Sequence, residues 1–165
     1  MISRRGRGWP LWLVLVLLVL MHFYVRPRLY SGPGAPDFLL IALVIYSLRS
    51  RPGPAAVAGF ITGIATDLLV PVRLGAGALA HTLVGYGTSW GRSVFFPDNL
   101  LVNGGMFALG VLLRNAVLLL LSGSGPAGLL QALAPGSLLQ ALTTAVAGTL
   151  VTLVIRHRVD FRLDE

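Results

Sequence analysis

The chain has 165 residues, of which 55% are hydrophobic and only 12% are charged, and its mean hydropathy is +0.80. A typical soluble domain carries about 25% charged residues, so this composition argues against a soluble enzyme, a disordered chain and a coiled coil. The 13 basic residues are all arginine and give a net charge of +7. They stand at the ends of apolar runs, which argues against nucleic-acid binding. Cysteine does not occur, which excludes disulfides and thiolate chemistry. Of the protein classes considered, a polytopic membrane protein is the one that this composition fits.

Six apolar runs follow one another along the chain. A membrane span needs about 20 mostly apolar residues, and five of the runs reach or approach that length. The second is shorter, but Pro36 suits a first helical turn, and the long side chain of Arg49 can carry its charge to the membrane interface. We therefore predict one all-α membrane domain, residues 1–165, a compact bundle of six helices. Its spans are predicted at 9–25, 36–48, 54–70, 75–90, 100–121 and 135–155.

The first run has the basic start of a secretory signal peptide. Its apolar stretch is long, however, and Arg26 and Arg28 follow it without a small-residue cleavage site. We therefore expect a retained membrane anchor rather than a cleaved leader.

The arginines also predict the orientation, because cytoplasmic segments of membrane proteins are enriched in basic residues. With the N-terminus inside, the cytoplasmic segments hold nine arginines and the outer segments three. The nine are Arg4, Arg5, Arg7, Arg49, Arg51, Arg92, Arg156, Arg158 and Arg162, and the three are Arg26, Arg28 and Arg73. Both termini are thus predicted to be cytoplasmic, in a multi-pass protein.

Ionisable residues inside spans are costly and need a structural or functional reason. Asp67 lies about one turn from the outer end of the third span. Arg114, followed by Asn115, lies at a similar depth in the fifth. One hypothesis is an Asp67–Arg114 ion pair with Asn115 adding hydrogen bonds; the alternative is that both side chains reach the interface separately. Asp37, at the outer start of the second span, is another candidate partner for Arg114.

Small residues recur at helical spacing in the third and fourth spans. Gly59, Gly63 and Asp67 are four residues apart and share one helix face, and the fourth span repeats the spacing around His81. Small residues allow helix backbones to approach closely. We expect internal packing here, with an interface to a partner helix as the alternative.

No catalytic or metal-binding pattern emerges. His81 is a lone histidine within a span, and we expect a neutral hydrogen-bonding role for it. Asp67 and Asp98 fall on opposite sides of the membrane, which makes them a poor acid–base pair. We therefore expect no enzyme activity, no metal and no cofactor. The segment 91–99 (GRSVFFPDN) is interpreted as an interfacial anchor, with a docking site for a cytoplasmic partner as the alternative.

The order of several short elements resembles a known family. They are Pro36-Asp37-Phe38-Leu39-Leu40, then Gly59-Phe60-Ile61-Thr62-Gly63-Ile64-Ala65-Thr66-Asp67, then Leu74-Gly75, Ala78-Leu79 and Val84-Gly85-Tyr86. Together they resemble the rod shape-determining membrane protein MreD family. The most distinctive part is Gly-Phe-x-x-Gly-x-x-x-Asp, although Thr66 stands where many members carry a longer polar side chain.

The resemblance implies a non-enzymatic scaffold of the cell-elongation machinery in the bacterial inner membrane. It implies MreC as a partner and functional links to MreB, RodA and a class B penicillin-binding protein, with membrane lipid around the bundle. It also implies a fold similar to the substrate-binding subunits of energy-coupling-factor transporters. The alternative function is therefore a solute-binding subunit of such a vitamin transporter, for which Asp67 and Arg114 near the outer side provide the motivation.

Overall fold

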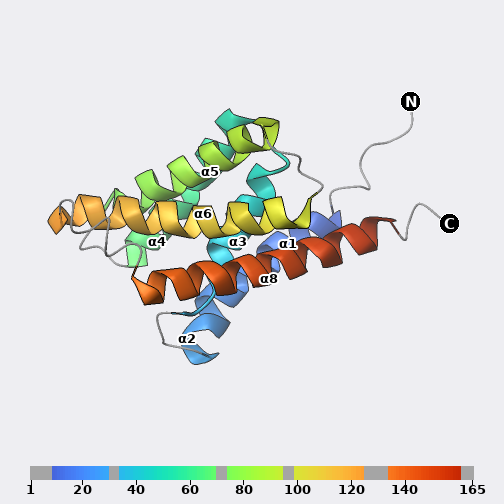
Figure 1. Ribbon diagram of the computed structural model, residues 1–165, viewed down its shortest axis with the longest axis horizontal. Coiled ribbons are helices and arrows are strands. Elements are labelled where there is room, and N and C mark those ends of the chain that lie inside the picture. Colours follow the sequence, from blue (N-terminus) through green and yellow to red (C-terminus); the bar gives the residue numbers. More distant parts are fainter. Residues whose placement is uncertain (1–8, 30–33, 70–73, 95–98, 125–133, 161–165) are drawn as a thin grey trace.

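A computed structural model describes residues 9–29, 34–69, 74–94, 99–124 and 134–160, and every regular element in these ranges is a helix (Figure 1). Helices lie in all six of the predicted ranges, so the all-α fold class is confirmed. They are α1 (Trp9–Leu20), continued by the π-helical turn η2 (Met21–Val25) and α2 (Arg26–Leu29); α3 (Phe38–Ser47); α4 (Pro52–Leu69); α5 (Ala76–Val94); α6 (Leu100–Leu119), continued by η4 (Leu120–Ser124); and α8 (Pro135–Asp160).

The helix ends follow local sequence signals. Pro52 and Pro135 begin α4 and α8, where a missing backbone N–H costs nothing. Asn99 caps α6 by accepting a hydrogen bond from the backbone N–H of Leu101. The π-helical turn η2 ends two residues before Pro27, a residue that disturbs regular α-helical hydrogen bonding. The first helical segment therefore continues past the predicted end at residue 25.

The short helix α3 is the centre of the bundle. It packs against α1, α4, α5, α6 and α8, and eight of its ten residues are buried. A helix that is apolar on all sides belongs in a core. At a rise of 1.5 Å per residue its ten residues extend about 15 Å, about half the thickness of a bilayer core. The shortest of the predicted spans is thus the helix around which the others pack.

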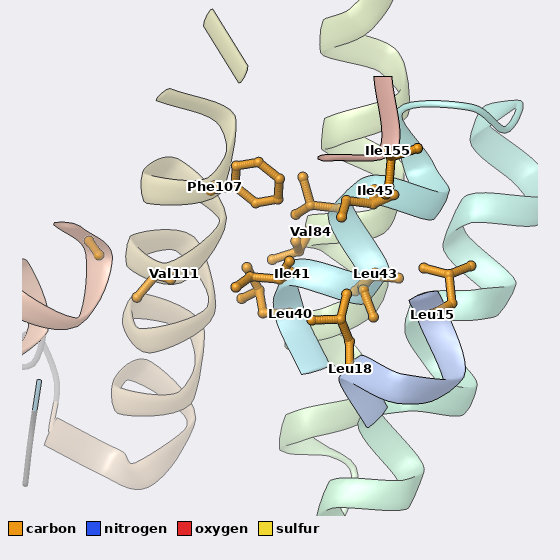
Figure 2. Close-up of a cluster of buried hydrophobic side chains, with 13 residues drawn as sticks. Leu15, Leu18, Leu40, Ile41, Leu43, Ile45, Val84, Phe107, Val111 and Ile155 are labelled. Atoms are coloured by element: carbon orange, nitrogen blue, oxygen red, sulfur yellow. The ribbon is translucent and has the colours of Figure 1, made fainter. Parts of the chain in front are cut away.

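A single hydrophobic cluster surrounds α3 (Figure 2). Leu40 and Ile41 lie at its centre, and Phe107 and Val111 pack against it from α6. The other labelled members come from α1, α3, α5 and α8: Leu15, Leu18, Leu43, Ile45, Val84 and Ile155. Buried apolar side chains from four other helices therefore converge on the central one.

The outer surface of the bundle is also apolar. Large hydrophobic side chains are exposed on all the long helices, for example Leu17, Ile61, Tyr86, Leu101 and Leu142. A soluble monomer rarely exposes so much contiguous apolar surface. The segments Leu100–Gly123 and Pro135–Arg156 are long and apolar enough to cross a membrane, judged by length and composition. These features are typical of a protein surrounded by lipid.

Part of the predicted interfacial anchor at 91–99 lies outside the described residues, which exclude 95–98. Within the described part, the guanidinium of Arg92 donates a hydrogen bond from Nη1 to the backbone carbonyl of Leu48. This contact ties the end of α5 to the end of α3.

Candidate functional site: a buried polar cluster around Asp37

The carboxylate of Asp37 is the centre of a buried polar cluster at the start of α3. Asp37 is the N-cap of this helix, and its Oδ1 accepts a hydrogen bond from the backbone N–H of Leu40 at 3.1 Å. Its Oδ2 lies 2.5 Å from Nη1 of Arg114 on α6. Only 1% of the Asp37 side chain is exposed, so arginine rather than water balances its charge. Of the two acids considered for Arg114, the structure pairs it with Asp37.

Arg114 is held in this position by its neighbour in the sequence. Oδ1 of Asn115 accepts hydrogen bonds from Nε and Nη2 of Arg114, at 3.2 and 2.9 Å. Nδ2 of Asn115 in turn donates to Oε1 of Gln140 on α8 at 3.3 Å. Asn115 thus supplies the hydrogen bonds expected of it, and the chain of polar contacts extends from α3 through α6 to α8.

The imidazole of His22 approaches the same carboxylate from the first helical segment. Its Nδ1 lies 3.2 Å from Oδ1 of Asp37 and 3.3 Å from the backbone nitrogen of Leu39. A protonated Nδ1 donates to the carboxylate, whereas a bare Nδ1 accepts from Leu39, and one nitrogen cannot do both at once. In either state the ring connects η2 to the start of α3.

Two threonines of α8 complete the cluster through the backbone before α3. The N–H of Asp37 donates to Oγ1 of Thr144 at 3.0 Å, and Oγ1 of Thr143 donates to the carbonyl of Gly34 at 2.8 Å. We call the side chains that meet here the Asp37 cluster: His22, Asp37, Arg114, Asn115, Gln140, Thr143 and Thr144. The cluster joins three helical regions to α3, namely η2, α6 and α8.

The hypothesis of an Asp67–Arg114 ion pair is wrong, because Asp67 has other partners. Its Oδ2 accepts hydrogen bonds from the backbone N–H groups of Gly75 and Ala78, at 2.9 and 3.0 Å, and its Oδ1 accepts one from Gly77 at 2.9 Å. These are unpaired N–H groups at the start of α5, where a negative charge is favourable. Asp67 therefore closes the turn between α4 and α5.

The same turn depends on Gly75. Its φ of +95° lies in the left-handed region that residues with a Cβ rarely adopt. This conformation accompanies the hydrogen bond from its N–H to Asp67. The Leu74-Gly75 element of the sequence is therefore explained by the turn that leads into α5.

We expect Asp67→Ala to lower the free energy of unfolding by about 2 kcal/mol, the upper end for loss of a helix N-cap, because three backbone N–H groups, two of them in buried hydrogen bonds, lose their acceptor. Asp67→Asn keeps one carbonyl oxygen and should lose less. Denaturant unfolding of the full chain in mild detergent measures both. Thr66→Ala is the matched control, since Thr66 bonds only to the carbonyl of Gly63 in its own helix. An Asp67→Ala protein as stable as the Thr66→Ala control would contradict the capping role.

Gly59 and Gly63 lie where α4 and α5 touch. A Cβ at Gly59 would collide with the backbone carbonyl of His81, and one at Gly63 would collide with the backbone of Gly77 and Ala78. The two helices are therefore in direct backbone contact, which only glycine permits. The spaced glycines serve packing within the chain, the first of the two interpretations considered.

His81 is buried on the α5 side of this contact, with 2% of its surface exposed. Its Nδ1 lies 2.8 Å from the carbonyl oxygen of Gly77, one turn earlier. Because a carbonyl only accepts, Nδ1 is the donor in this hydrogen bond and carries a proton. Nε2 has no hydrogen-bond partner among the described residues, and no group of three metal-binding side chains occurs among them. The ring has the hydrogen-bonding role expected, in a location separate from His22.

The candidate residues taken from the sequence do not include four members of the Asp37 cluster: His22, Gln140, Thr143 and Thr144. A usable signal was present for Gln140, because it stands four residues before Thr144 and therefore shares its helix face. The sequence contains no comparable signal for His22, because the direction in which its side chain points depends on the π-helical turn.

The arrangement is suited to holding helices together. Both oxygens of Asp37 and both oxygens of Asp67 already accept hydrogen bonds from protein groups. Removing one member of a buried ion pair leaves an uncompensated charge, which is strongly destabilising. The charged groups within the bundle therefore fix which helices lie next to each other.

The model of one family, described as rod shape-determining protein MreD, matches residues 3–156. No curated protein and no solved structure gives a significant match, so the likeness to energy-coupling-factor subunits stays a prediction. The family is a shape-determining component of cells and not a known family of enzymes. Since the match covers nearly the whole sequence, the chain belongs to the MreD family of rod shape-determining membrane proteins.

Proposed function

We propose that this chain is a non-enzymatic scaffold in the membrane part of the rod-shape machinery. The observation that carries the proposal is that each carboxylate oxygen of Asp37 and Asp67, the buried acids among the described residues, already accepts a hydrogen bond from the chain itself. A solute site needs polar groups that remain available to a ligand. The family match does not support the alternative of a vitamin-transporter subunit.

The six helical segments form one membrane domain of the bacterial inner membrane, with both termini in the cytoplasm. Three observations support this arrangement: the excess of arginine in the segments assigned to the inside, the exposed apolar side chains on the long helices, and the start of α1 and the end of α8, which both lie toward the right of the view in Figure 1. The short α3 is compatible with a span because Asp37 and Arg49 stand at its two ends.

The direct partner is MreC, and the functional links are to MreB, RodA and a class B penicillin-binding protein. This part of the proposal rests on membership of the family and on the short segments that connect the helices, which leave no soluble domain for chemistry. Binding then uses membrane-embedded surfaces and supports regulated peptidoglycan synthesis without any reaction on this chain.

Co-purification tests the scaffold function. Tagged full-length chain, extracted in mild detergent, is expected to retain MreC, and depletion of the chain from rod-shaped cells is expected to produce round cells. Arg114→Gln should reduce the retained MreC because it loosens the bundle, whereas Arg51→Gln, an exposed arginine between α3 and α4, should not. Cells that keep their rod shape after depletion, together with no retained MreC, would refute the scaffold function.

A further inference from the structure

Nε2 of His81 is a buried polar atom without a hydrogen-bond partner among the described residues. Only 2% of the residue is exposed, and its Nδ1 already donates to the carbonyl of Gly77. Burial favours the neutral form of an imidazole, in which the nitrogen without the proton is an acceptor. Because buried polar atoms almost always have a partner in the protein or in ordered water, we expect a donor at Nε2.

Three helices meet one turn away from the ring. A Cβ built on Gly110 of α6 would lie 3.3 Å from Cδ2 of Leu40 on α3 and 3.4 Å from Cγ1 of Val84 on α5. Leu40 and Val84 belong to the same hydrophobic cluster (Figure 2). At the other end of the two helices, Arg92 of α5 donates to the carbonyl of Leu48 at the end of α3. Residue numbers therefore rise in the same direction along α3 and α5.

Asp37, His81 and Arg114 lie together on one side of this contact. Asp37 and His81 each stand three residues before the contact residue of their helix, and Arg114 stands four residues after that of α6. Residues three or four apart share a helix face, and the bond from Arg114 to Asp37 shows that α6 runs in the opposite direction to α3. The three side chains are therefore at one level of the bundle. The ring of His81 also lies within electrostatic range of both charges.

The guanidinium of Arg114 has further donors at this level. Arginine carries five N–H donors, and three of those of Arg114 are used, one by Asp37 and two by Asn115. Among the described residues the other two N–H groups have no partner, and no direct hydrogen bond joins α5 to the Asp37 cluster. An acceptor on α5 and donors on α6 thus lie at the same depth without bonding to each other. Buried waters bridge unpaired groups of this kind.

We propose that one water molecule is bound inside the bundle between His81 and Arg114, donating to Nε2 of the imidazole and accepting from the guanidinium. A buried water makes two to four hydrogen bonds, whereas a solute needs more converging polar groups to be oriented. The side chains packed around Gly110 close the site one turn away. The site goes beyond the scaffold function, because it connects α5 to the cluster that joins η2, α6 and α8 to α3.

The test detects water at the ring directly. The full chain, with isotope-labelled histidine and phenylalanine, is reconstituted in lipid bilayers, and solid-state NMR measures the magnetisation that passes from water protons to each side chain. The chain has three histidines, so the signals of His81 are assigned by difference from His81→Asn. Transfer to His81 is expected to be clearly faster than to Phe107, which is 0% exposed in the hydrophobic cluster. The nitrogen shift of Nε2 should be that of a hydrogen-bonded acceptor.

A variant without the guanidinium tests the second partner of the water. Asp37→Asn with Arg114→Met removes the donor without leaving a charge unpaired, so transfer to His81 should fall to the level of Phe107. Thr82→Val is the matched control on α5, because the hydroxyl of Thr82 donates to the carbonyl of Ala78 in its own helix. This control should keep the full transfer.

Three results decide against the proposal. A wild-type ring that receives no more magnetisation than Phe107, or whose Nε2 is protonated or unbonded, overturns it whether or not the variants fold. Full transfer to His81 in the chain without the guanidinium also overturns it, because the water would then be held by other groups. The assay contains no partner protein, so its failure leaves the scaffold function untouched.

Discussion

Replacing Asp37 by Asn or Arg114 by Gln is expected to lower the free energy of unfolding by about 3–5 kcal/mol, the usual cost of breaking a buried ion pair from one side. In each case the remaining charge stays in the bundle without its partner, since 1% of Asp37 and 17% of Arg114 are exposed. The asparagine at position 37 keeps a side-chain oxygen that can still cap α3, so the loss reports mainly the broken ion pair. Denaturant titration in detergent measures the effect.

The double variant, with both changes in one chain, shows whether the two side chains interact or contribute to stability independently. With no charge left unpaired, its destabilisation should be clearly smaller than the sum for the single variants, and the difference is the coupling energy. Arg51→Gln serves as the control, because Arg51 is exposed and its loss should be nearly neutral. Additive effects of Asp37→Asn and Arg114→Gln would mean that the two side chains do not interact.

Gly63→Val is expected to separate α4 from α5 and to cost about 3 kcal/mol, the upper part of the range for an overpacked core. The added side chain meets the backbone of Gly77 and Ala78, and backbone inside a helix cannot rotate away as a side chain can. The shift also displaces the N–H groups that Asp67 holds. Thermal unfolding and protease sensitivity of the detergent-solubilised chain report the change.

Gly87→Ala is the matched control in α5. Nothing lies within 4 Å of a Cβ built on Gly87, and alanine is the better helix former by about 1 kcal/mol. This variant should therefore be as stable as the natural chain or slightly more so. A Gly63→Val protein that unfolds like Gly87→Ala would show that the close contact of the two helices is not needed.

The apolar runs were enough to predict the all-helical fold, because six separate runs require six helical segments whatever their packing. They did not reveal that α3 is the central helix. Its short length and the fact that nearly all its residues are apolar were visible, but the identity of the five helices around it depends on tertiary contacts. The sequence also indicated internal packing at Gly59 and Gly63, since their spacing is a local property of one helix face, but it did not show that the helix in contact is α5.

The sequence narrowed the candidate partners of Arg114 to two acids, but it did not decide between them. Depth along a span is readable from sequence, and both Asp37 and Asp67 were assigned to the outer part of the bundle. The sequence does not show in which direction around the helix axis a side chain points, nor which helix lies on that side. Asp67 accepts hydrogen bonds from backbone N–H groups at the start of α5, across a short turn. Arg114 pairs with Asp37 instead.

The most direct test of the scaffold account is made in rod-shaped cells whose own copy of the gene has been replaced. Both charges of the pair are removed together, with Asp37→Asn and Arg114→Gln in one chain, and cell shape is scored while the amount of protein in the membrane is measured. If the pair serves helix packing, cells with a normal amount of this neutral protein remain rods. Round cells at a normal protein level would mean that the charges perform a function beyond packing, and would contradict the account.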